Sequence, residues 1–243
     1  MKARIQFLLQ RILGLKTYLK IFSWYKIKTL HNDTGENDFF HFLQLIPKGS
    51  NVLDIGANIG IMAYYLSKRV STGTVHAFEP MPQNLSALRW VIRRFKLDNI
   101  KVSDLALGNE TGSIQMVMPV VENVKKQGLS HVLSDDIKEF NEGDTFTTSI
   151  AKLDDLAEIK DTAISAIKID VENFEYHVFL GAEQVLRKNR PIIYCELWDN
   201  ENRYKCFDFM KQLNYSIKFK QGDGLIHFDE DNHTTQNFFF IPE

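Results

Sequence analysis

Apolar segments of strand length alternate with amphipathic segments of helix length along most of this chain, and this alternation constrains the fold more than any other feature. The expected strands are residues 51–55, 74–78, 100–105, 166–171, 191–197, 216–220 and 237–241, and the expected helices are residues 59–69, 82–95, 175–188 and 203–213. Such an order favours parallel strands joined by right-handed crossovers, with helices on both faces of the sheet. We therefore expect an α/β fold with a mostly parallel, seven-stranded sheet whose last strand is antiparallel.

Two segments depart from this alternation. Residues 109–152 contain two short expected strands, 113–118 and 145–150, on either side of a polar stretch. We expect this insertion to lie over the carboxyl edge of the sheet. Residues 1–47 precede the first strand and include a short expected helix at 38–46, so we divide the chain into an N-terminal helical extension, 1–47, and a main domain, 48–243.

The composition suits one folded domain. The chain has 243 residues, of which 44% are hydrophobic and 25% charged. The net charge of −2 gives no basic excess for phosphate binding, so we expect no nucleic-acid partner.

Cys195 and Cys206 are the only cysteines, and their spacing fits no zinc site. Because Cys195 lies in an expected core strand, we predict a free thiol, a reducing compartment and a cytoplasmic location.

The first 30 residues are basic and contain no acidic residue. Their bases are Lys2, Arg4, Arg11, Lys16, Lys20, Lys26 and Lys28. Apolar residues from Ile5 to Leu19 recur at helical spacing, which predicts a basic amphipathic helix. Charged residues and Gln interrupt the apolar run, so the segment is neither a signal peptide nor a membrane span. Two interpretations remain: the helix packs on the domain or on a second copy in a homodimer, or it contacts an anionic membrane surface peripherally.

The loop after the first expected strand has the composition of a nucleotide-binding turn. Gly56 allows a sharp turn and a close approach of ligand, and Gly60 allows close helix packing. Asn58 stands where a dinucleotide fingerprint has its second glycine, so a pyrophosphate fits less well. Asp54 places a negative charge beside the loop, which favours an ammonium over a phosphate. We expect Asp54, Gly56, Ala57, Asn58 and Gly60 to bind the cofactor.

Two further strand ends contribute acidic side chains. Glu79, followed by Pro80, ends the second expected strand, where a carboxylate can accept hydrogen bonds from both hydroxyls of a ribose. Asp104 and Leu105 end the third, where an apolar surface and a hydrogen-bonding group suit an adenine. Because the carboxyl ends of neighbouring parallel strands meet at one crevice, these residues favour an adenosine derivative with a positive charge. S-adenosylmethionine carries both an ammonium and a sulfonium.

The chain resembles the FkbM family of S-adenosylmethionine-dependent methyltransferases over about residues 48–200. The matching segments are DIGANIG (54–60), FEP (78–80), LDDL (153–156), IKIDVENFE (167–175), GA (181–182) and residues 191–196. The resemblance implies a Rossmann-like class I methyltransferase fold and transfer of a methyl group to a hydroxyl of a sugar, lipid or polyketide-like acceptor. Asn173 stands where the family usually has glycine, and asparagine tolerates the left-handed backbone that such a turn needs.

The fourth expected strand ends in two carboxylates, Asp170 and Glu172. Repulsion between them would raise one pKa toward that of a base. We expect Asp170 to contact the cofactor or the acceptor, whereas Glu172 either acts as the base or anchors the following helix. Glu196, at the next strand end, either faces the acceptor or only caps or pairs locally, and His131 in the insertion is a further candidate base. The acceptor pocket is expected to form from the insertion, the N-terminal helices and the tail.

Several alternatives compete with this interpretation. The carboxylates Asp170, Glu196 and Asp199 with Asn200 loosely permit a magnesium site, but we predict no metal. An N-methyltransferase is disfavoured because its D/N-P-P-Y/F motif is absent after the fourth expected strand. From other classes, a nicotinamide-dependent oxidoreductase on a Rossmann fold and a non-catalytic binding module both stay open.

Overall fold

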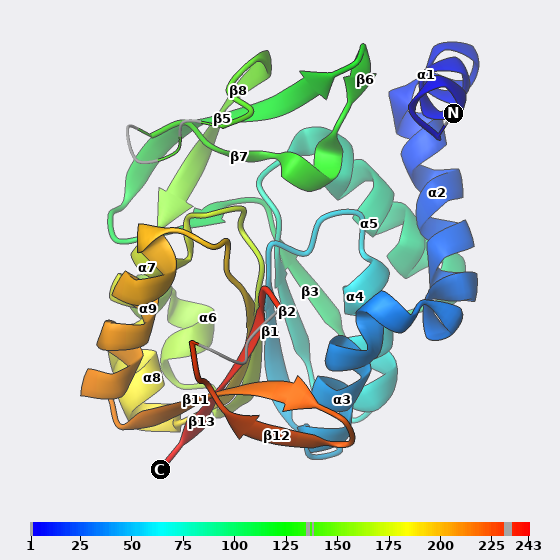
Figure 1. The fold of residues 1–243 in the computed structure, drawn as a ribbon. Helices are drawn as coiled ribbons and strands as arrows, with labels where there is room; N and C mark the ends of the chain where they lie inside the picture. The colour runs from blue at the N-terminus through cyan, green and yellow to red at the C-terminus, as the bar shows by residue number, and fades with distance from the viewer. Residues whose placement is uncertain (1, 135–136, 138, 231–234) are drawn as a thin grey trace.

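A large mixed sheet forms the centre of the protein (Figure 1). The computed structural model describes residues 2–134, 137, 139–230 and 235–243, with side chains from Arg4 onward. Among these residues the sheet has eight strands in the order β12-β11-β13-β10-β9-β1-β2-β3. The strands are β1 (Asn51–Ile55), β2 (Val75–Phe78), β3 (Ile100–Ser103), β9 (Ile164–Ile169), β10 (Ile192–Glu196), β11 (Tyr215–Gln221), β12 (Gly224–His227) and β13 (Asn237–Pro242).

Strands β3, β2, β1, β9 and β10 pair in parallel, and β13 is antiparallel to both β10 and β11. The expected fold class is therefore confirmed, but the sheet has one strand more than the seven we expected. The extra strand, β12, forms a hairpin with β11 around Gly222, whose φ of +58° starts a two-residue turn. Its residues look like a polar connection in the sequence because this edge strand has few buried side chains.

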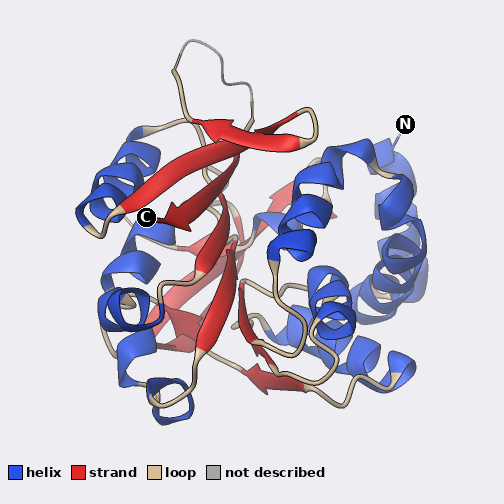
Figure 2. Cartoon of the chain, turned by 90° about the horizontal axis from the view of Figure 1, so that it is seen from below, coloured by secondary structure: helices blue, strands red, loops and turns tan. Residues whose placement is uncertain are grey.

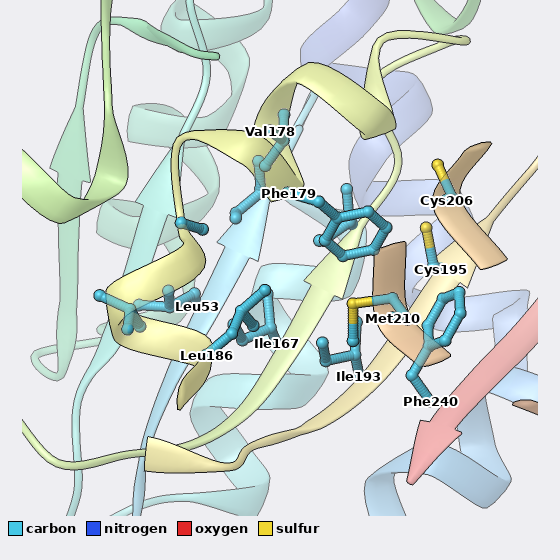
Figure 3. Packing of buried hydrophobic residues seen from close by; sticks show 14 of the residues in the cluster. Leu53, Ile167, Val178, Phe179, Leu186, Ile193, Cys195, Cys206, Met210 and Phe240 are labelled. Atoms are coloured by element: carbon cyan, nitrogen blue, oxygen red, sulfur yellow. The ribbon is translucent and has the colours of Figure 1, made fainter. Parts of the chain in front are cut away.

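Helices cover both faces of the sheet (Figures 1 and 2). One face carries α3 (Asn37–Leu45), α4 (Ile61–Arg69) and α5 (Pro82–Phe95), and the other carries α6 (Ala157–Lys160), α7 (Glu175–Leu180), α8 (Glu183–Asn189) and α9 (Glu201–Gln212). Alternate side chains along each strand point to opposite faces. Leu53, Ile167 and Ile193 therefore pack under α7–α9 (Figure 3), whereas Val52 and Ala166 face α3.

Both cysteines belong to the apolar cluster under α7–α9 (Figure 3). Cys195 and Cys206 are buried and carry free thiols. The expected thiol at Cys195 is thus confirmed, and burial raises the pKa of both thiols well above the ordinary value.

The N-terminal segment forms two helices where we expected one. Helices α1 (Lys2–Leu13) and α2 (Leu15–Thr29) are separated by Gly14, whose φ of +71° interrupts the helical backbone. Leu19 and Ile27 of α2 pack against the main domain, and two short 3-10 helices, Leu30–Asn32 and Thr34–Glu36, lead into α3. No helix in the described part of the chain combines the length and apolar character that crossing a bilayer requires.

The single helix expected over 175–188 is also divided in two, α7 and α8, at Gly181. A Cβ atom on Gly181 would lie 1.9 Å from the carbonyl oxygen of Gly108, so the end of α7 touches the loop before β5. Asp154 then begins α8, because its two carboxylate oxygens accept hydrogen bonds from the backbone N–H groups of Gln184 and Val185, each at 2.9 Å. The LDDL and GA motifs therefore fix one helix junction.

The insertion forms a second, smaller sheet at the carboxyl ends of the main strands (Figure 1). Its strands are β4 (Ala106–Leu107), β5 (Gly112–Val121), β6 (Val124–Lys125), β7 (His131–Val132) and β8 (Gly143–Ala151). The two expected strands, 113–118 and 145–150, fall within β5 and β8, which pair antiparallel along most of their length.

Candidate active site

A cavity lies between the carboxyl ends of the main strands and the inserted sheet. The empty space in it, open solvent included, measures about 560 Å³. The strand ends contribute Gly56, Asn58, Glu79, Pro80, Leu105, Asp170 and Glu172, and the insertion contributes Met116, Gln127, Gly128, Ser130 and Val132. We call this space the first cavity.

A second cavity adjoins the first on the side of the N-terminal helices. Its residues from that side are Phe22, Lys26, Leu30 and Glu36, and it also includes Ala57 and Lys168. The two cavities share Gly56, Asn58, Gln127 and Asp170. The insertion and the N-terminal helices therefore both contribute to the cleft, as the sequence led us to expect, whereas none of the tail residues that the structure describes lines these two cavities.

The glycine loop after β1 is shaped by contacts within the protein. Gly56 has a φ of +76°, and a Cβ there would lie 1.9 Å from the carbonyl oxygen of Asp170. The absence of a side chain therefore brings the ends of β1 and β9 together, in addition to leaving backbone exposed in the cleft. Gly60 has a φ of +83° and packs against Leu88 of α5, which confirms its expected role in helix packing but places it outside both cavities.

Glu79 is a buried carboxylate at the end of β2 that faces the first cavity. Its Oε2 accepts a hydrogen bond from the backbone N–H of Asn58 at 2.7 Å, and its Oε1 accepts one from that of Met81 at 2.8 Å. Burial raises the pKa of Glu79 to about 7, although these two hydrogen bonds and that of Asn84 oppose the rise. The side chain is thus fixed in place and titrates near neutral pH.

The first cavity has an apolar part with unused hydrogen-bonding atoms around it. Its apolar side chains are Phe78, Met81, Leu105, Met116, Val132 and Phe174. Asn58 Oδ1, Asn84 Oδ1 and Ser130 Oγ are buried and find no hydrogen-bond partner within the described part of the chain. Buried polar atoms are normally paired, so these three atoms suit a flat ligand with hydrogen-bonding edges.

Asp104 is an expected strand-end acid that lies outside the two cavities. Its side chain is exposed, and its Oδ2 lies 3.3 Å from an Nη2 atom of Arg89, outside the two cavities. The expected cofactor contact of Asp104 is therefore not what the structure shows. The residue follows the last paired residue of β3, where sequence alone does not fix the direction of a side chain.

Asp54 also lies farther from the cleft than we expected. It is fully buried in β1, opposite Lys168 of β9, and its Oδ1 is 3.5 Å from the Lys168 Nζ. Lys168 Nζ donates a hydrogen bond to the Gly56 carbonyl at 2.8 Å and lies 3.5 Å from an Asp170 carboxylate oxygen. The charge of Asp54 is thus neutralised within the protein, and it supports the glycine loop through Lys168.

Sequence reasoning missed Lys168, which is the central cation of the site. Burial lowers its pKa, but Asp170, Asp54 and Glu196 outweigh that effect, so the net shift is upward and the ammonium is retained. A signal was present in the sequence, because a lysine inside the apolar strand AIKIDV must either be exposed or find a buried acid.

Several carboxylates lie near this one ammonium. Burial, together with Asp170, Glu196 and Glu175, raises the pKa of Glu172 to about 10. Burial and Asp170 raise the pKa of Glu196 to about 7, and burial also raises that of Glu36 from the N-terminal segment. These carboxylic groups outnumber the ammonium of Lys168, and their ionised forms would stabilise a cationic ligand. Glu196 contributes to this field although it lines neither cavity.

The turn after β9 holds Asp170 and Glu172 in place. Glu172 and Asn173 have φ values of +56° and +73°, so asparagine does adopt the left-handed conformation at the position where the family usually has glycine. Glu175 Oε1 accepts hydrogen bonds from the backbone N–H groups of Val171 and Asn173 at 3.2 and 3.1 Å. Glu175, the last acid of the segment IKIDVENFE, therefore stabilises the turn.

His131 lies in the inserted sheet rather than at the cleft. Its ring is fully buried, with Nδ1 at 2.8 Å from the Leu129 carbonyl and Nε2 at 2.9 Å from Asn141 Oδ1. Both nitrogens are occupied, which contradicts its expected role as a base. In the described part of the chain, no cluster of three or more histidine, cysteine or acidic side chains could hold a metal ion.

The comparison with known protein families identifies this arrangement. A family profile described as Methyltransferase FkbM domain matches residues 54–217, from Asp54 of β1 into β11. The chain belongs to the FkbM methyltransferase family. The FkbM match includes the glycine loop, Glu79 and the turn after β9, whereas the N-terminal helices that border the second cavity lie outside it.

Two curated relatives are methyltransferases by name. The 31-O-demethyl-FK506 methyltransferase FkbM of Streptomyces tacrolimicus is 30% identical over 59% of this chain and 63% of its own length. Methyltransferase 1 of Beauveria bassiana is 24% identical over 56% of this chain and 60% of its own length. This chain thus matches about three fifths of these two relatives.

The fold is also that of a solved FkbM structure. The methyltransferase FkbM of Methylobacillus flagellatus KT superimposes with a TM-score of 0.59 at 16% identity, covering 98% of this chain and 59% of the other. This likeness includes the N-terminal helices, and it concerns the fold alone.

Proposed function

We propose that this FkbM-family chain binds S-adenosylmethionine in the first cavity and transfers a methyl group to a hydroxyl of a sugar, lipid or polyketide-like acceptor. The observation that carries the proposal is the meeting of Glu79, from the end of β2, with Asp170 and Glu172, from the end of β9, in one cavity lined by three carboxylic groups. S-adenosylmethionine supplies an electrophilic methyl group on a sulfonium. The protein must bind and align the two reactants and remove the proton of the acceptor hydroxyl.

The adenosine part has its partners at the ends of β2 and β4. Glu79 can accept a hydrogen bond from a ribose hydroxyl at Oε2, which has one protein donor, and a second one at Oε1 in place of its long contact with Asn84. The slot between Met81, Leu105 and Met116 suits the adenine, and the unpartnered Asn84 Oδ1 and Ser130 Oγ can bond its polar edge.

The methionine part belongs beside the glycine loop. Gly56, Asn58 and Asp170 line both cavities there. The ammonium and sulfonium are attracted by the carboxylates around Asp170. The same charges would repel a pyrophosphate, which disfavours the nicotinamide-dependent alternative.

The acceptor hydroxyl must lose a proton when the oxygen–methyl bond forms and the sulfur–methyl bond breaks in line. A base works best when its pKa is near the operating pH. Glu196, with a pKa of about 7, meets this condition, whereas Glu172, with a pKa of about 10, is neutral until a cation binds next to it. Because Glu172 lines the first cavity and Glu196 does not, we assign proton removal to Glu172 once a bound cation has lowered its pKa, with Asp170 aligning the reactants.

An oxygen acceptor is supported by the S. tacrolimicus relative, which is named for a 31-O-demethyl compound. The test is transfer of a tritiated methyl group from S-adenosylmethionine to pooled glycan, lipid and small-molecule fractions. We expect label in one fraction, released on chemical cleavage of methyl ethers, and at least a hundredfold less with Asp170→Asn, a loss that general-base or alignment groups typically cause.

Asp104→Asn is the matched control, because it removes a carboxylate at the rim that is paired with Arg89 outside the cleft. Label on a nitrogen or carbon of the acceptor would overturn the oxygen specificity. Equal loss of activity in both variants would overturn the assignment of Asp170.

A further inference from the structure

Helix α1 is held on the protein by its polar side. The Gln10 side chain donates a hydrogen bond to the Lys125 carbonyl and accepts one from the Lys125 N–H, both at 3.1 Å. One turn earlier, Gln6 Oε1 accepts a hydrogen bond from Lys126 Nζ at 3.2 Å. This attachment to β6 of the insertion fixes which side of α1 faces the protein.

The apolar side of α1 therefore faces solvent. At 3.6 residues per turn, Ile5, Leu8 and Ile12 lie together on a side of the helix that points away from the two glutamines. They are 53%, 55% and 69% exposed, and Leu9 beside them is also exposed. An amphipathic helix normally buries this side against its own domain, so the reverse orientation calls for an external apolar partner.

Helix α2 adds exposed side chains of a particular kind. Ile21, Trp24 and Tyr25 are 48%, 40% and 55% exposed, although Leu19 and Ile27 on the opposite side are buried. Tryptophan and tyrosine are the residues that concentrate where a bilayer meets water, because each has an apolar ring and a polar group.

The charges around these side chains have one sign. Arg4, Arg11, Lys16 and Lys28 are exposed, and the first acidic residue in the chain is Asp33. Arg4 and Arg11 lie on the flank of α1 opposite the glutamines, beside the apolar side. A second copy of this chain would bring the same positive charges to a twofold contact, and the two sets would repel. The complementary partner is apolar inside and anionic at its surface.

We propose that α1 and the exposed side of α2 dock on the surface of an anionic lipid bilayer. Helix α1 lies in the plane of the interface, with Ile5, Leu8 and Ile12 among the acyl chains and the arginines at the phosphate level. Phe22 and Lys26 of α2 border the second cavity, so the helix that docks is also a wall of the cleft.

The experiment is sedimentation of the full chain with vesicles of phosphatidylcholine, with and without phosphatidylglycerol. We expect binding to the anionic vesicles, accompanied by a blue shift of emission that Trp24→Phe removes. Raising the salt from about 0.1 M to about 1 M, which shortens the Debye length from about 10 Å to about 3 Å, should weaken binding.

Two kinds of variant separate the apolar and the charged contributions. Ile12→Asp should reduce partitioning onto the anionic vesicles about tenfold. This factor corresponds to the transfer free energy of one buried isoleucine side chain. Arg4→Gln and Arg11→Gln should each reduce partitioning about fivefold. This factor corresponds to the interaction free energy of one basic residue with an anionic surface. The matched controls are Ile226→Asp, which changes an exposed isoleucine of β12, and Lys211→Gln, on α9 at the other flank of the molecule.

Equal binding to neutral vesicles, or no binding to anionic ones, would overturn the proposal. So would a dimer in solution that Ile12→Asp dissociates while vesicles leave the chain unbound, because a second copy would then cover the helix. All the changed residues are exposed and outside the cleft, so affinity for S-adenosylmethionine should stay the same in every variant. If the chain does not bind vesicles as proposed, the proposed methyl transfer is therefore unaffected.

Discussion

At the scale of single residues, the site depends on a buried lysine. Lys168 lies between Asp54 and Asp170 and donates a hydrogen bond to the Gly56 carbonyl. A buried ion pair contributes little over an apolar pair, but removing one partner leaves a costly isolated charge. Lys168 therefore connects the stability of the fold to the shape of the cofactor loop.

Lys168→Met should lower the free energy of unfolding by about 3–5 kcal/mol, because Asp54 is left buried without a counter-charge. Urea denaturation followed by circular dichroism measures this. The loss should be smaller at acidic pH, where Asp54 is protonated, and the double variant with Asp54→Asn should recover much of it. Arg187→Met, which removes an exposed i,i+4 pair with Glu183, is the control and should change little. A loss below about 1 kcal/mol in Lys168→Met would contradict the role of the lysine.

Glu79 makes the affinity for S-adenosylmethionine depend on pH. Its folded pKa of about 7 lies above the ordinary value of 4.5, so its contribution to stability is present below pH 4.5 and is lost as the pH rises through about 7. Cofactor affinity should change in the opposite sense and rise through about pH 7, because the ionised carboxylate accepts both ribose hydrogens.

Glu79→Gln should flatten this pH profile and weaken binding by about 1–3 kcal/mol, as judged from calorimetric Kd values over a pH series. Asp104→Asn serves again as the control and should keep the profile of the unchanged chain. A profile that persists in Glu79→Gln would assign the titration to another group.

At the scale of elements, the strands and most helices follow from local patterns, and the junctions do not. The alternation of apolar residues places β1, β2, β9 and β10 within two residues of their ends. The break between α7 and α8 is invisible in a pattern that stays amphipathic throughout, since it arises from the contact of Gly181 with Gly108. The hairpin that adds β12 depends on a turn and an exposed edge, which carry no apolar signal.

In the candidate site, too, local patterns predict some residues, whereas contacts between different segments determine the position of others. Glu79 and Asp170 could be predicted, because a residue directly after a buried parallel strand must lie at the carboxyl edge of the sheet. Asp54 and His131 could not be placed, because their contacts with Lys168 and Asn141 join distant or separately folded segments. A charged residue inside an apolar strand signals a buried pair, and that signal identifies Lys168 in retrospect.

Gly181→Ala tests the junction between α7 and α8. Its backbone conformation is ordinary, but a Cβ would meet the Gly108 carbonyl oxygen at 1.9 Å, so overpacking should cost about 1–3 kcal/mol in unfolding free energy. Gly224→Ala, where a Cβ meets nothing within 4 Å, should be nearly neutral. Equal thermal stability of the two variants would show that the junction tolerates a side chain.

At the scale of the whole molecule, the cleft is assembled from three stretches of sequence. The sheet edge provides Glu79 and Asp170, the insertion provides Gln127 and Ser130, and the N-terminal helices close the second cavity. The family profile begins at residue 54, so the N-terminal helices lie outside it. We therefore expect them to determine which acceptor reaches the methyl group.

The central claim is that a cleft with excess carboxylates accepts a cationic adenosine derivative. Isothermal calorimetry of the full chain, with S-adenosylmethionine and NAD titrated separately in two buffers of different ionisation enthalpy, tests it most directly. The account predicts that S-adenosylmethionine binds and releases protons, because a bound cation favours the ionised forms of Glu172 and Glu79, whose pKa values without ligand are about 10 and about 7. Binding of NAD in place of S-adenosylmethionine, or binding of S-adenosylmethionine without proton release, would contradict it.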